Sequence, residues 1–524
     1  MPAEQPNVSS RLGADDETVV RSGTERSERR RRSRRSGGRF REFIEDVPGW
    51  WLAVLLVAAP WAYGTTFPET KEWLAKGLCV LGGAFIFSLL LRGRALRVSW
   101  LSLGLSFLIL GYGWFITWNA KLTYDPHLFY FHPGSPHLPS WPGSVDQRTS
   151  ADQMLLITGL FCAFWVVSDL CTRERWRQRF WLVLSLAGVS IVVLGLVQRL
   201  SGAPGIFWRT DLECGNTFFA TYRYHANAGA FINLILPFVA AQCASAFRRD
   251  ASGFGKVFWT LSVLAVITSA CVNLSRAATL ISAGIMAIFL VWQFFEITRR
   301  RGHGFNAMQT VVVLAIVIVG SWLMVREVGF SKAYQHWQEL GGVLADNFRY
   351  AAYDTIEHRV LPQSGWFGFG PNTFSLIFPF FTNALGYRIW GYWEQAHQDY
   401  LQTLVEWGYG GAVLWFFLFG NSIARAIHSL WRRRRMWDGR TRALAIAALL
   451  ALVSVLLHST VDFPMQIASL QLYVSVILGM VAALPYIDST RHRRFSTLPG
   501  TDSIEEPATV NGTHLVFEGR KGVM

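Results

Sequence analysis

Long apolar stretches alternate with short polar segments along most of the chain. Each apolar stretch runs for about 18–22 residues, the length that an α-helix needs to cross the hydrocarbon core of a bilayer. The predicted membrane-spanning helices lie at 48–66, 73–91, 99–118, 151–170, 180–200, 225–246, 257–274, 277–295, 307–325, 405–424, 442–461 and 466–486. The pattern therefore predicts an all-α polytopic membrane protein with about twelve transmembrane helices.

Basic residues gather in every second gap between these stretches. The clusters are Arg92, Arg94 and Arg97; Arg173, Arg175, Arg177 and Arg179; Arg248, Arg249 and Lys256; Arg299–Arg301; Arg432–Arg435; and Arg491, Arg493 and Arg494. Cytoplasmic loops carry an excess of Lys and Arg, so this alternation predicts that both termini are cytoplasmic. Residues 48–486 then form one transmembrane domain between a basic, disordered tail at 1–47 and a second cytoplasmic tail at 487–524.

Composition supports this class and excludes others. Hydrophobic residues make up 51% of the chain and charged residues 16%, whereas a soluble protein carries about 25% charged residues. The formal net charge of +14 does not indicate nucleic-acid binding, because the basic residues lie in clusters typical of topology signals. The six cysteines match no metal-binding or disulfide spacing, and we expect neither a metal nor a cofactor.

The remaining gaps open on the opposite face, and the largest is an extracytoplasmic loop at 326–404. A loop of this length in a compact bundle is usually functional. It contains the glycine-rich run Gly365–Gly370, whose backbone can turn tightly and approach a ligand, although no strand precedes it as a phosphate loop requires. The gap at 119–150 carries three histidines among Pro and Gly, a pattern that favours an interfacial cap over a metal site.

Titratable residues gather where the long loop meets the next apolar stretch. His397 lies there, with Asp399 two residues after it and Glu394 three residues before it. Such a cluster at the end of a membrane helix is costly to maintain and usually marks function. The alternative is a histidine that only caps the helix or lies at the interface.

Two arginines on the same face each allow two interpretations. Arg276 lies in a very short gap and either reaches lipid headgroups or faces a substrate anion. Arg349 lies in the long loop and either binds an anion or is a solvated arginine paired with Asp346 or Asp354.

A further pair of titratable residues lies where the eleventh stretch ends. His458 and Asp462 are four residues apart, so both side chains can lie on one helix face. Either they belong to a site or they only satisfy each other at the interface, and the second interpretation is favoured.

Several motifs match one family in order and topology. Residues 396–402 read Ala-His-Gln-Asp-Tyr-Leu-Gln, and residues 406–411 read Glu-Trp-Gly-Tyr-Gly-Gly. Further matches are Arg349, the run Gly368–Phe374, His-Ser-Thr-Val-Asp-Phe-Pro at 458–464, residues 215–237 and Ser275-Arg276. On these residues the chain resembles the O-antigen ligase/polymerase superfamily of bacterial membrane glycosyltransferases over most of residues 48–486.

The resemblance implies a GT-C-like membrane glycosyltransferase that acts without a metal. Such an enzyme moves a glycan from a polyprenyl diphosphate carrier to an acceptor hydroxyl on the outer face of the bacterial inner membrane. Its partners would be the carrier-linked glycan donor, a lipid or saccharide acceptor and membrane lipid. Two positions depart from the family pattern, because Gln398 replaces an Asn and Tyr353 stands where a Trp is common.

The matched positions imply roles for individual residues. His397 would be the general base, since an imidazole titrates near neutral pH, and Asp399 or Glu394 would orient its ring. Arginines would hold the diphosphate, because a guanidinium binds phosphate oxygens bidentately. The first choices are Arg276 and Arg349, followed by Arg223 and Arg388. The supporting residues would be Glu406, His458, Asp462, His225 and Asn227.

The motifs leave the reaction open within the superfamily. A ligase moves a finished polysaccharide to its acceptor, whereas a polymerase joins carrier-linked repeat units; the His-x-Asp-Tyr-Leu-Gln match slightly favours a ligase. The rival class is a polysaccharide transporter or scaffold without chemistry. A transporter would show paired charges near the middle of the membrane and interrupted helices in repeated halves, and neither pattern is evident in the sequence.

Overall fold

The structure is a computed structural model that describes residues 43–92, 96–211, 217–248, 252–298, 319–320, 322–323, 326, 348–382, 389, 393–433 and 436–487. Several sequence expectations lie outside these residues. They are the tails at 1–42 and 488–524, most of the predicted span 307–325, and Arg388.

Eleven helices among the described residues are long and apolar enough to cross a membrane. They are the first helix Phe43–Trp61, α2 (Pro68–Arg92), α3 (Trp100–Trp118), α4 (Gln147–Leu170), α5 (Glu174–Leu200), α6 (His225–Arg248), α7 (Gly253–Val272), α8 (Arg276–Thr298), α15 (Asp399–Arg433), α16 (Gly439–His458) and α17 (Ala468–Ala483). They correspond to the predicted spans other than 307–325, which confirms the all-α polytopic fold.

Several helices begin four to six residues before their predicted starts, and two of these differences matter for the predicted tail and for the site. The first helix already begins at Phe43, five residues before the predicted start at 48, inside the segment predicted as tail. α15 begins at Asp399 rather than at 405, because its first two turns are polar and hydropathy does not detect them. An acidic first residue suits the helix N-terminus, where the helix dipole favours negative charge.

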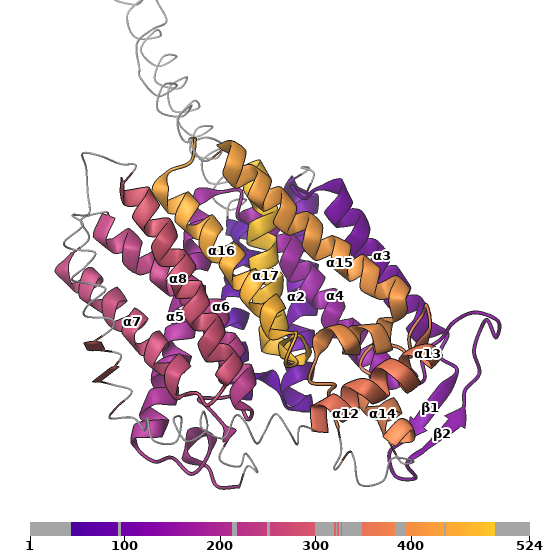
Figure 1. The fold of residues 1–524 in the computed structure, drawn as a ribbon. Helices are drawn as coiled ribbons and strands as arrows, with labels where there is room; N and C mark the ends of the chain where they lie inside the picture. Colours follow the sequence, from indigo (N-terminus) through magenta and orange to yellow (C-terminus); the bar gives the residue numbers. More distant parts are fainter. Residues whose placement is uncertain are drawn as a thin grey trace, which may run out of the picture.

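Shorter elements lie together at one end of the bundle (Figure 1). They are the hairpin β1 (Leu122–Asp125) and β2 (Tyr130–Pro133), paired antiparallel with Leu122 opposite Pro133, and the loop helices α12 (Phe348–Thr355), η4 (Ile356–Val360), α13 (Leu361–Ser364) and α14 (Phe374–Thr382). Single turns are η1 (Tyr63–Thr65), η2 (Ile206–Trp208), η6 (Pro464–Gln466) and η7 (Leu484–Tyr486). The sequence had not predicted the hairpin.

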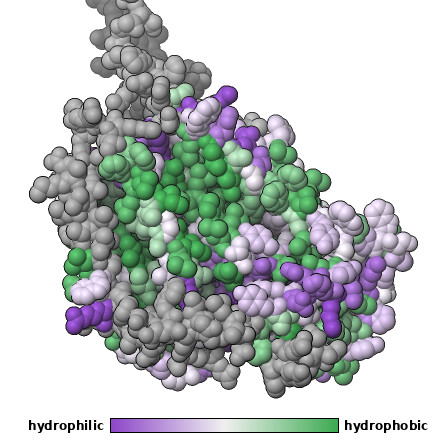
Figure 2. Space-filling view, in the orientation of Figure 1, coloured by the Kyte–Doolittle hydropathy of each residue, from purple (hydrophilic) through white to green (hydrophobic). Residues whose placement is uncertain are grey.

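The centre of the bundle is formed by α6, α16, α17 and α4, which pack against one another. The apolar stretches of α6 and α17 are 94% and 89% buried, whereas the apolar stretch of α15 is only 22% buried. Figure 2 shows hydrophobic side chains across the middle of one face, with hydrophilic residues towards its edges. This distribution is the one that a lipid-facing surface requires.

α15 is interrupted at Gly408, where φ is 64° and ψ is −176°. The glycine-rich run lies along this kink and hydrogen-bonds to it in both directions. The Gly370 N–H donates to the Glu406 carbonyl oxygen at 2.9 Å, and the Gly410 N–H donates to the Trp366 carbonyl oxygen at 3.0 Å. The run therefore satisfies backbone groups that the kink exposes, and it anchors the long loop to the start of α15.

Candidate functional site

His397 lies two residues before α15 with its backbone in the left-handed region, at φ 54°. Non-glycine residues adopt this region rarely, and such strained positions concentrate at functional sites. The His397 Nδ1 lies 3.3 Å from Oδ1 of Asp462. The histidine side chain is 26% exposed, whereas that of Asp462 is 6% exposed. The buried carboxylate of Asp462 thus fixes the Nδ1 side of the His397 ring, while the rest of the ring remains accessible.

This hydrogen bond determines which ring nitrogen carries the proton in neutral His397. An ionised carboxylate only accepts hydrogen bonds, so Nδ1 must donate. Nε2 then keeps its lone pair and can accept a proton from a hydroxyl group. The arrangement is that of a general base oriented by a carboxylate.

Asp462 follows α16, and both of its carboxylate oxygens accept hydrogen bonds. Oδ1 also accepts the N–H of Phe463 at 3.1 Å, and Oδ2 accepts the hydroxyl of Tyr224 at 3.3 Å. Burial would raise the pKa of Asp462, but the hydrogen bond from His397 and the charge of Arg349 outweigh it and leave the pKa below its ordinary value. Asp462 therefore stays ionised.

Arg349, on α12, brings positive charge to the same group. It donates to the Tyr224 hydroxyl at 2.9 Å and to the Val461 carbonyl oxygen at 3.0 Å, and its NH2 lies 3.9 Å from Oδ2 of Asp462. Burial would lower the pKa of Arg349, but Tyr224 and Asp462 raise it overall. The arginine lies beside Asp462, and 31% of its side chain is exposed. Of the two partners that the alternative interpretation named, Asp354 contacts His358, and Asp346 lies outside the described residues.

Tyr224 joins these residues and comes directly before α6. Its hydroxyl accepts from Arg349 and donates to Asp462, which makes a continuous chain from the arginine to His397. Burial raises the pKa of Tyr224, so the hydroxyl keeps the proton that it donates. Its ring stacks on Phe463 with 5.6 Å between centroids and 1° between planes.

Aromatic rings surround His397. Phe463 and Trp393 approach its ring edge-to-face with centroids at 4.8 and 5.4 Å, and Tyr224 does so at 6.0 Å. These contacts restrict the imidazole to one orientation.

The strained backbone of His397 is held from two sides. The Tyr353 hydroxyl donates to the His397 carbonyl oxygen at 2.7 Å. The N–H of the preceding residue, Ala396, donates to Oε1 of Gln402 at 3.0 Å. Tyr353, a departure from the family pattern, thus has a definite structural role here.

Glu406 is buried beneath this loop and connects it to the glycine-rich run. Its Oε1 accepts from Gln402 at 2.9 Å, and its Oε2 accepts the N–H of Asn372 at 2.9 Å. Glu406 therefore ties the chain after the glycine-rich run to α15, and Gln402 connects it to the backbone beside His397.

The carboxylates expected to orient His397 do not do so in the structure. Asp399 is buried against the turn after α16, where it accepts from the Ser459 hydroxyl at 2.8 Å and from the Met465 N–H at 2.9 Å. Helix geometry turns its side chain away, because it already belongs to the first turn of α15. Glu394 is exposed. The orienting residue is Asp462, which the sequence had grouped with His458.

His458 also differs from its favoured interpretation. It is fully buried, and among the described residues neither of its ring nitrogens has a hydrogen-bond partner. Asp462 accepts a hydrogen bond from His397 instead, so the expected hydrogen bond between the side chains of His458 and Asp462 does not form. The reason is that α16 ends at His458, and the turn that follows redirects Asp462.

The remaining candidates lie at the same end of the bundle. His225 and Asn227 are in the first turn of α6, and the His225 ring lies 4.7 Å from that of Tyr224. Arg276 is the first residue of α8. The turn before α8 packs closely on α6, because a Cβ on Gly229 of α6 would lie 2.7 Å from Nδ2 of Asn273 in that turn. Arg223 is exposed and lies over the ring of Phe67, 5.3 Å from its centroid.

Sequence reasoning missed Tyr224, Phe463 and Trp393 as parts of the site. Phe463 lies within a matched motif, and Tyr224 precedes the polar start of α6, so proximity to a motif was the available signal. Two of the three histidines between 119 and 150 contact groups outside the site. His137 stacks on Trp118, and His132 faces Asp125 at 3.8 Å.

Residues 261–416 match a family model described as O-antigen ligase. The matched range contains Arg276, Arg349, His397, Asp399 and Glu406, and it ends before Asp462. A search of curated proteins found no match.

Proposed function

We propose that the chain, which matches the O-antigen ligase family model over residues 261–416, is a glycosyltransferase of that superfamily that moves a glycan from a polyprenyl diphosphate carrier to an acceptor hydroxyl. The observation that carries this proposal is the hydrogen bond between His397 and Asp462 at the edge of the bundle. It leaves Nε2 of an accessible imidazole as a proton acceptor, which is what attack by a hydroxyl requires.

In the proposed reaction the acceptor oxygen attacks the anomeric carbon of the donor. A new glycosidic bond forms, the bond from the anomeric carbon to the diphosphate oxygen breaks, and the hydroxyl proton passes to Nε2 of His397. Asp462 stabilises the imidazolium that results. General-base catalysis contributes about 10²–10⁴-fold, so stabilisation of the departing charge must supply much of the remaining acceleration.

Arginines would supply that stabilisation, because negative charge builds on the diphosphate as it leaves. Arg349 is the first choice, since it is charged, partly exposed and held beside Asp462. Arg276 at the start of α8 is the second, where its charge adds to the positive end of the helix dipole. Arg223, which is exposed, is the next choice, and Arg388 remains a candidate outside the described residues.

We place the site at the outer face of the bacterial inner membrane, with both termini in the cytoplasm. The support is the distribution of basic clusters, which alternate with the loops that carry the site. The acceptor would be a lipid or saccharide, and the ligase reaction is favoured over polymerisation.

The carrier-linked glycan pool of cells that lack the gene tests this function. The cells are complemented with wild type, His397→Asn or empty vector, and the membrane level of each protein is measured. Asparagine tolerates the left-handed backbone better than alanine does, so it removes the base while preserving the loop. Long diphosphate-linked chains accumulating with His397→Asn would support a ligase.

Other outcomes of the experiment separate the alternatives. Accumulation of single carrier-linked repeat units would assign a polymerase that uses the same base. A pool unchanged between wild type and His397→Asn would refute the enzyme proposal and leave transport or scaffolding.

A further inference from the structure

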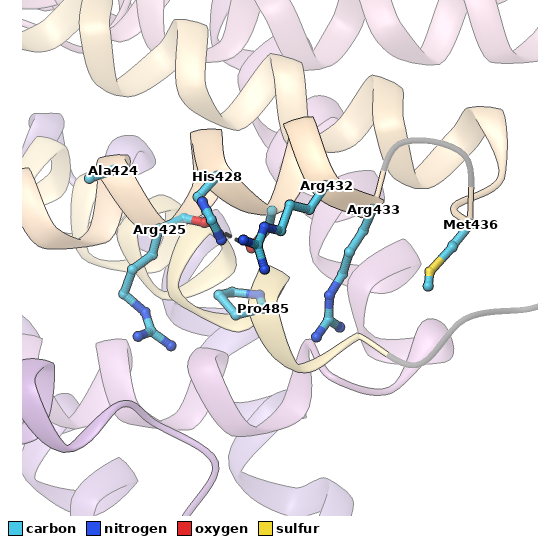
Figure 3. A pocket seen from close by; sticks show the side chains of 8 residues that line it. Ala424, Arg425, His428, Arg432, Arg433, Met436 and Pro485 are labelled. Atoms are coloured by element: carbon cyan, nitrogen blue, oxygen red, sulfur yellow. Dashed lines mark hydrogen bonds between the residues drawn. The ribbon is translucent and has the colours of Figure 1, made fainter.

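A second polar site lies at the opposite end of α15 from His397. There a hollow of about 700 Å³ opens between the last turns of α15 and η7. Figure 3 shows Arg425, His428, Arg432 and Arg433 arranged along α15 above Pro485. Nothing in the proposed transfer reaction requires positive charge on this side of the membrane.

The basic side chains of this hollow share one face of the helix. Arg425, His428 and Arg432 recur at intervals of three and four residues, the spacing of neighbours on a helix surface. Arg432 and His428 are exposed. None of the lining residues that the structure describes is acidic, so their charge is not cancelled within the hollow.

Two of the arginines are held in place by the chain after α17. Arg425 donates to the Tyr486 hydroxyl at 3.4 Å and lies 5.9 Å from the centroid of that ring. Arg433 donates to the Ile487 carbonyl oxygen at 3.2 Å. These contacts pre-organise the wall of the hollow and leave Arg432 as its most accessible guanidinium.

The surroundings of the hollow are apolar and belong to the membrane boundary. Ala424, Met436 and Pro485 are its apolar lining residues, and Ser429 completes the lining. On the same helix Ile427 and Trp431 are exposed, and the Trp431 side chain is 70% exposed. Exposed tryptophan marks the level of lipid headgroups in membrane proteins.

We propose that this hollow binds the phosphate group of an anionic membrane lipid, with the acyl chains lying along the exposed apolar side of α15. Guanidinium groups bind phosphate oxygens bidentately, and basic pockets between membrane helices accept such headgroups. A soluble phosphate would use the same cations but not the apolar surface, and that surface favours the lipid.

Native mass spectrometry of the detergent-purified full chain tests this inference. Phosphatidylglycerol and phosphatidylcholine are added separately, and the lipid retained per protein is counted. The wild type is expected to retain phosphatidylglycerol preferentially. Arg425→Gln/Arg432→Gln is expected to weaken that retention by about tenfold or more, as follows from the loss of two cations near a headgroup. The single variant Arg432→Gln provides the same test if the double variant does not fold.

The matched control is Arg97→Gln/Lys256→Gln, which removes two cations outside the hollow. It is expected to retain phosphatidylglycerol as the wild type does. Equal loss in both double variants, or no preference of the wild type for phosphatidylglycerol, would overturn the inference. So would a rise in melting temperature with inorganic phosphate but not with phosphatidylglycerol, because the site would then accept soluble phosphate. The binding readout is independent of transferase activity.

Discussion

His397 and Asp462 are 65 residues apart in the chain, yet Nδ1 of the histidine lies 3.3 Å from Oδ1 of the aspartate. The pair joins the start of α15 to the turn that follows α16. Arg349 and Tyr224 complete it from α12 and the start of α6. Four separate segments thus contribute one side chain each to the same small group.

Replacing Asp462 with Asn should lower transfer activity substantially. Asparagine keeps the shape of the side chain but cannot stabilise an imidazolium by charge, so we expect a loss of about 10²–10⁴-fold, the range of general-base effects. Initial rates of glycan transfer in membranes with a carrier-linked donor measure it. Asp354→Asn is the control, because Asp354 forms only an exposed contact with His358. Equal rates for Asp462→Asn and wild type would contradict the proposed role.

Replacing Tyr224 with Phe should remove the hydroxyl that bridges Arg349 and Asp462 by hydrogen bonds, while preserving the aromatic stack on Phe463. The hydroxyl is the only part removed, and it bonds both Arg349 and Asp462. We expect a stability loss of about 1–3 kcal/mol and a fall in the rate constant for transfer. Thermal unfolding and transfer rates measure the two effects. Tyr130→Phe, at an exposed position of the hairpin, should change neither.

Replacing Gly408 with Ala should prevent the kink of α15 from docking on the glycine-rich run. A Cβ there would lie 2.5 Å from the backbone nitrogen of Gly368, and φ is 64°. We expect a destabilisation of at least about 1–3 kcal/mol from the backbone strain alone, seen as a lower melting temperature and less folded protein. Gly420→Ala on the same helix meets nothing within 4 Å and should be neutral or slightly stabilising.

Replacing Asp399 with Ala should reduce folded protein rather than specific activity. Its carboxylate accepts hydrogen bonds from Ser459, Met465 and Gln466, and their loss leaves buried donors unsatisfied at about 1–3 kcal/mol each. The amount of monodisperse protein after detergent extraction and the rate per folded molecule distinguish the two roles. A normal yield combined with a large loss of rate per molecule would instead indicate that Asp399 takes part in the reaction.

The difference in melting temperature between wild type and Asp462→Asn should shrink as pH falls, and only at acidic pH. The folded state lowers the pKa of Asp462, so its contribution is fully present above the ordinary aspartate pKa of about 3.9 and is lost as pH falls through the folded value. Melting temperatures of both proteins between pH 3 and 8, a range that brackets about 3.9, would show it. A difference that disappears between about pH 8 and 6 would contradict this assignment.

Local sequence was enough to identify His397 and Asp462 as candidates, because titratable groups at membrane helix ends are unusual. Arg349 became a candidate through its position in the long loop and the motif match. Local sequence was not enough to pair them. Asp399 is close to His397 in the chain, but it belongs to the first turn of α15 and faces the turn after α16. Tyr224 carried no signal of its own, since a tyrosine at a membrane interface is common.

The sequence by itself determined the membrane class, the helices and their order, because crossing a bilayer demands about twenty apolar residues with every backbone group satisfied within the helix. It could not determine which side chains meet, since contact between Asp462 and His397 depends on how α15, α16 and the long loop pack. The tertiary structure decided that pairing, as it decided that the glycine-rich run would lie against the kink at Gly408. Such contacts join residues far apart in the chain, and only the packed bundle brings them together.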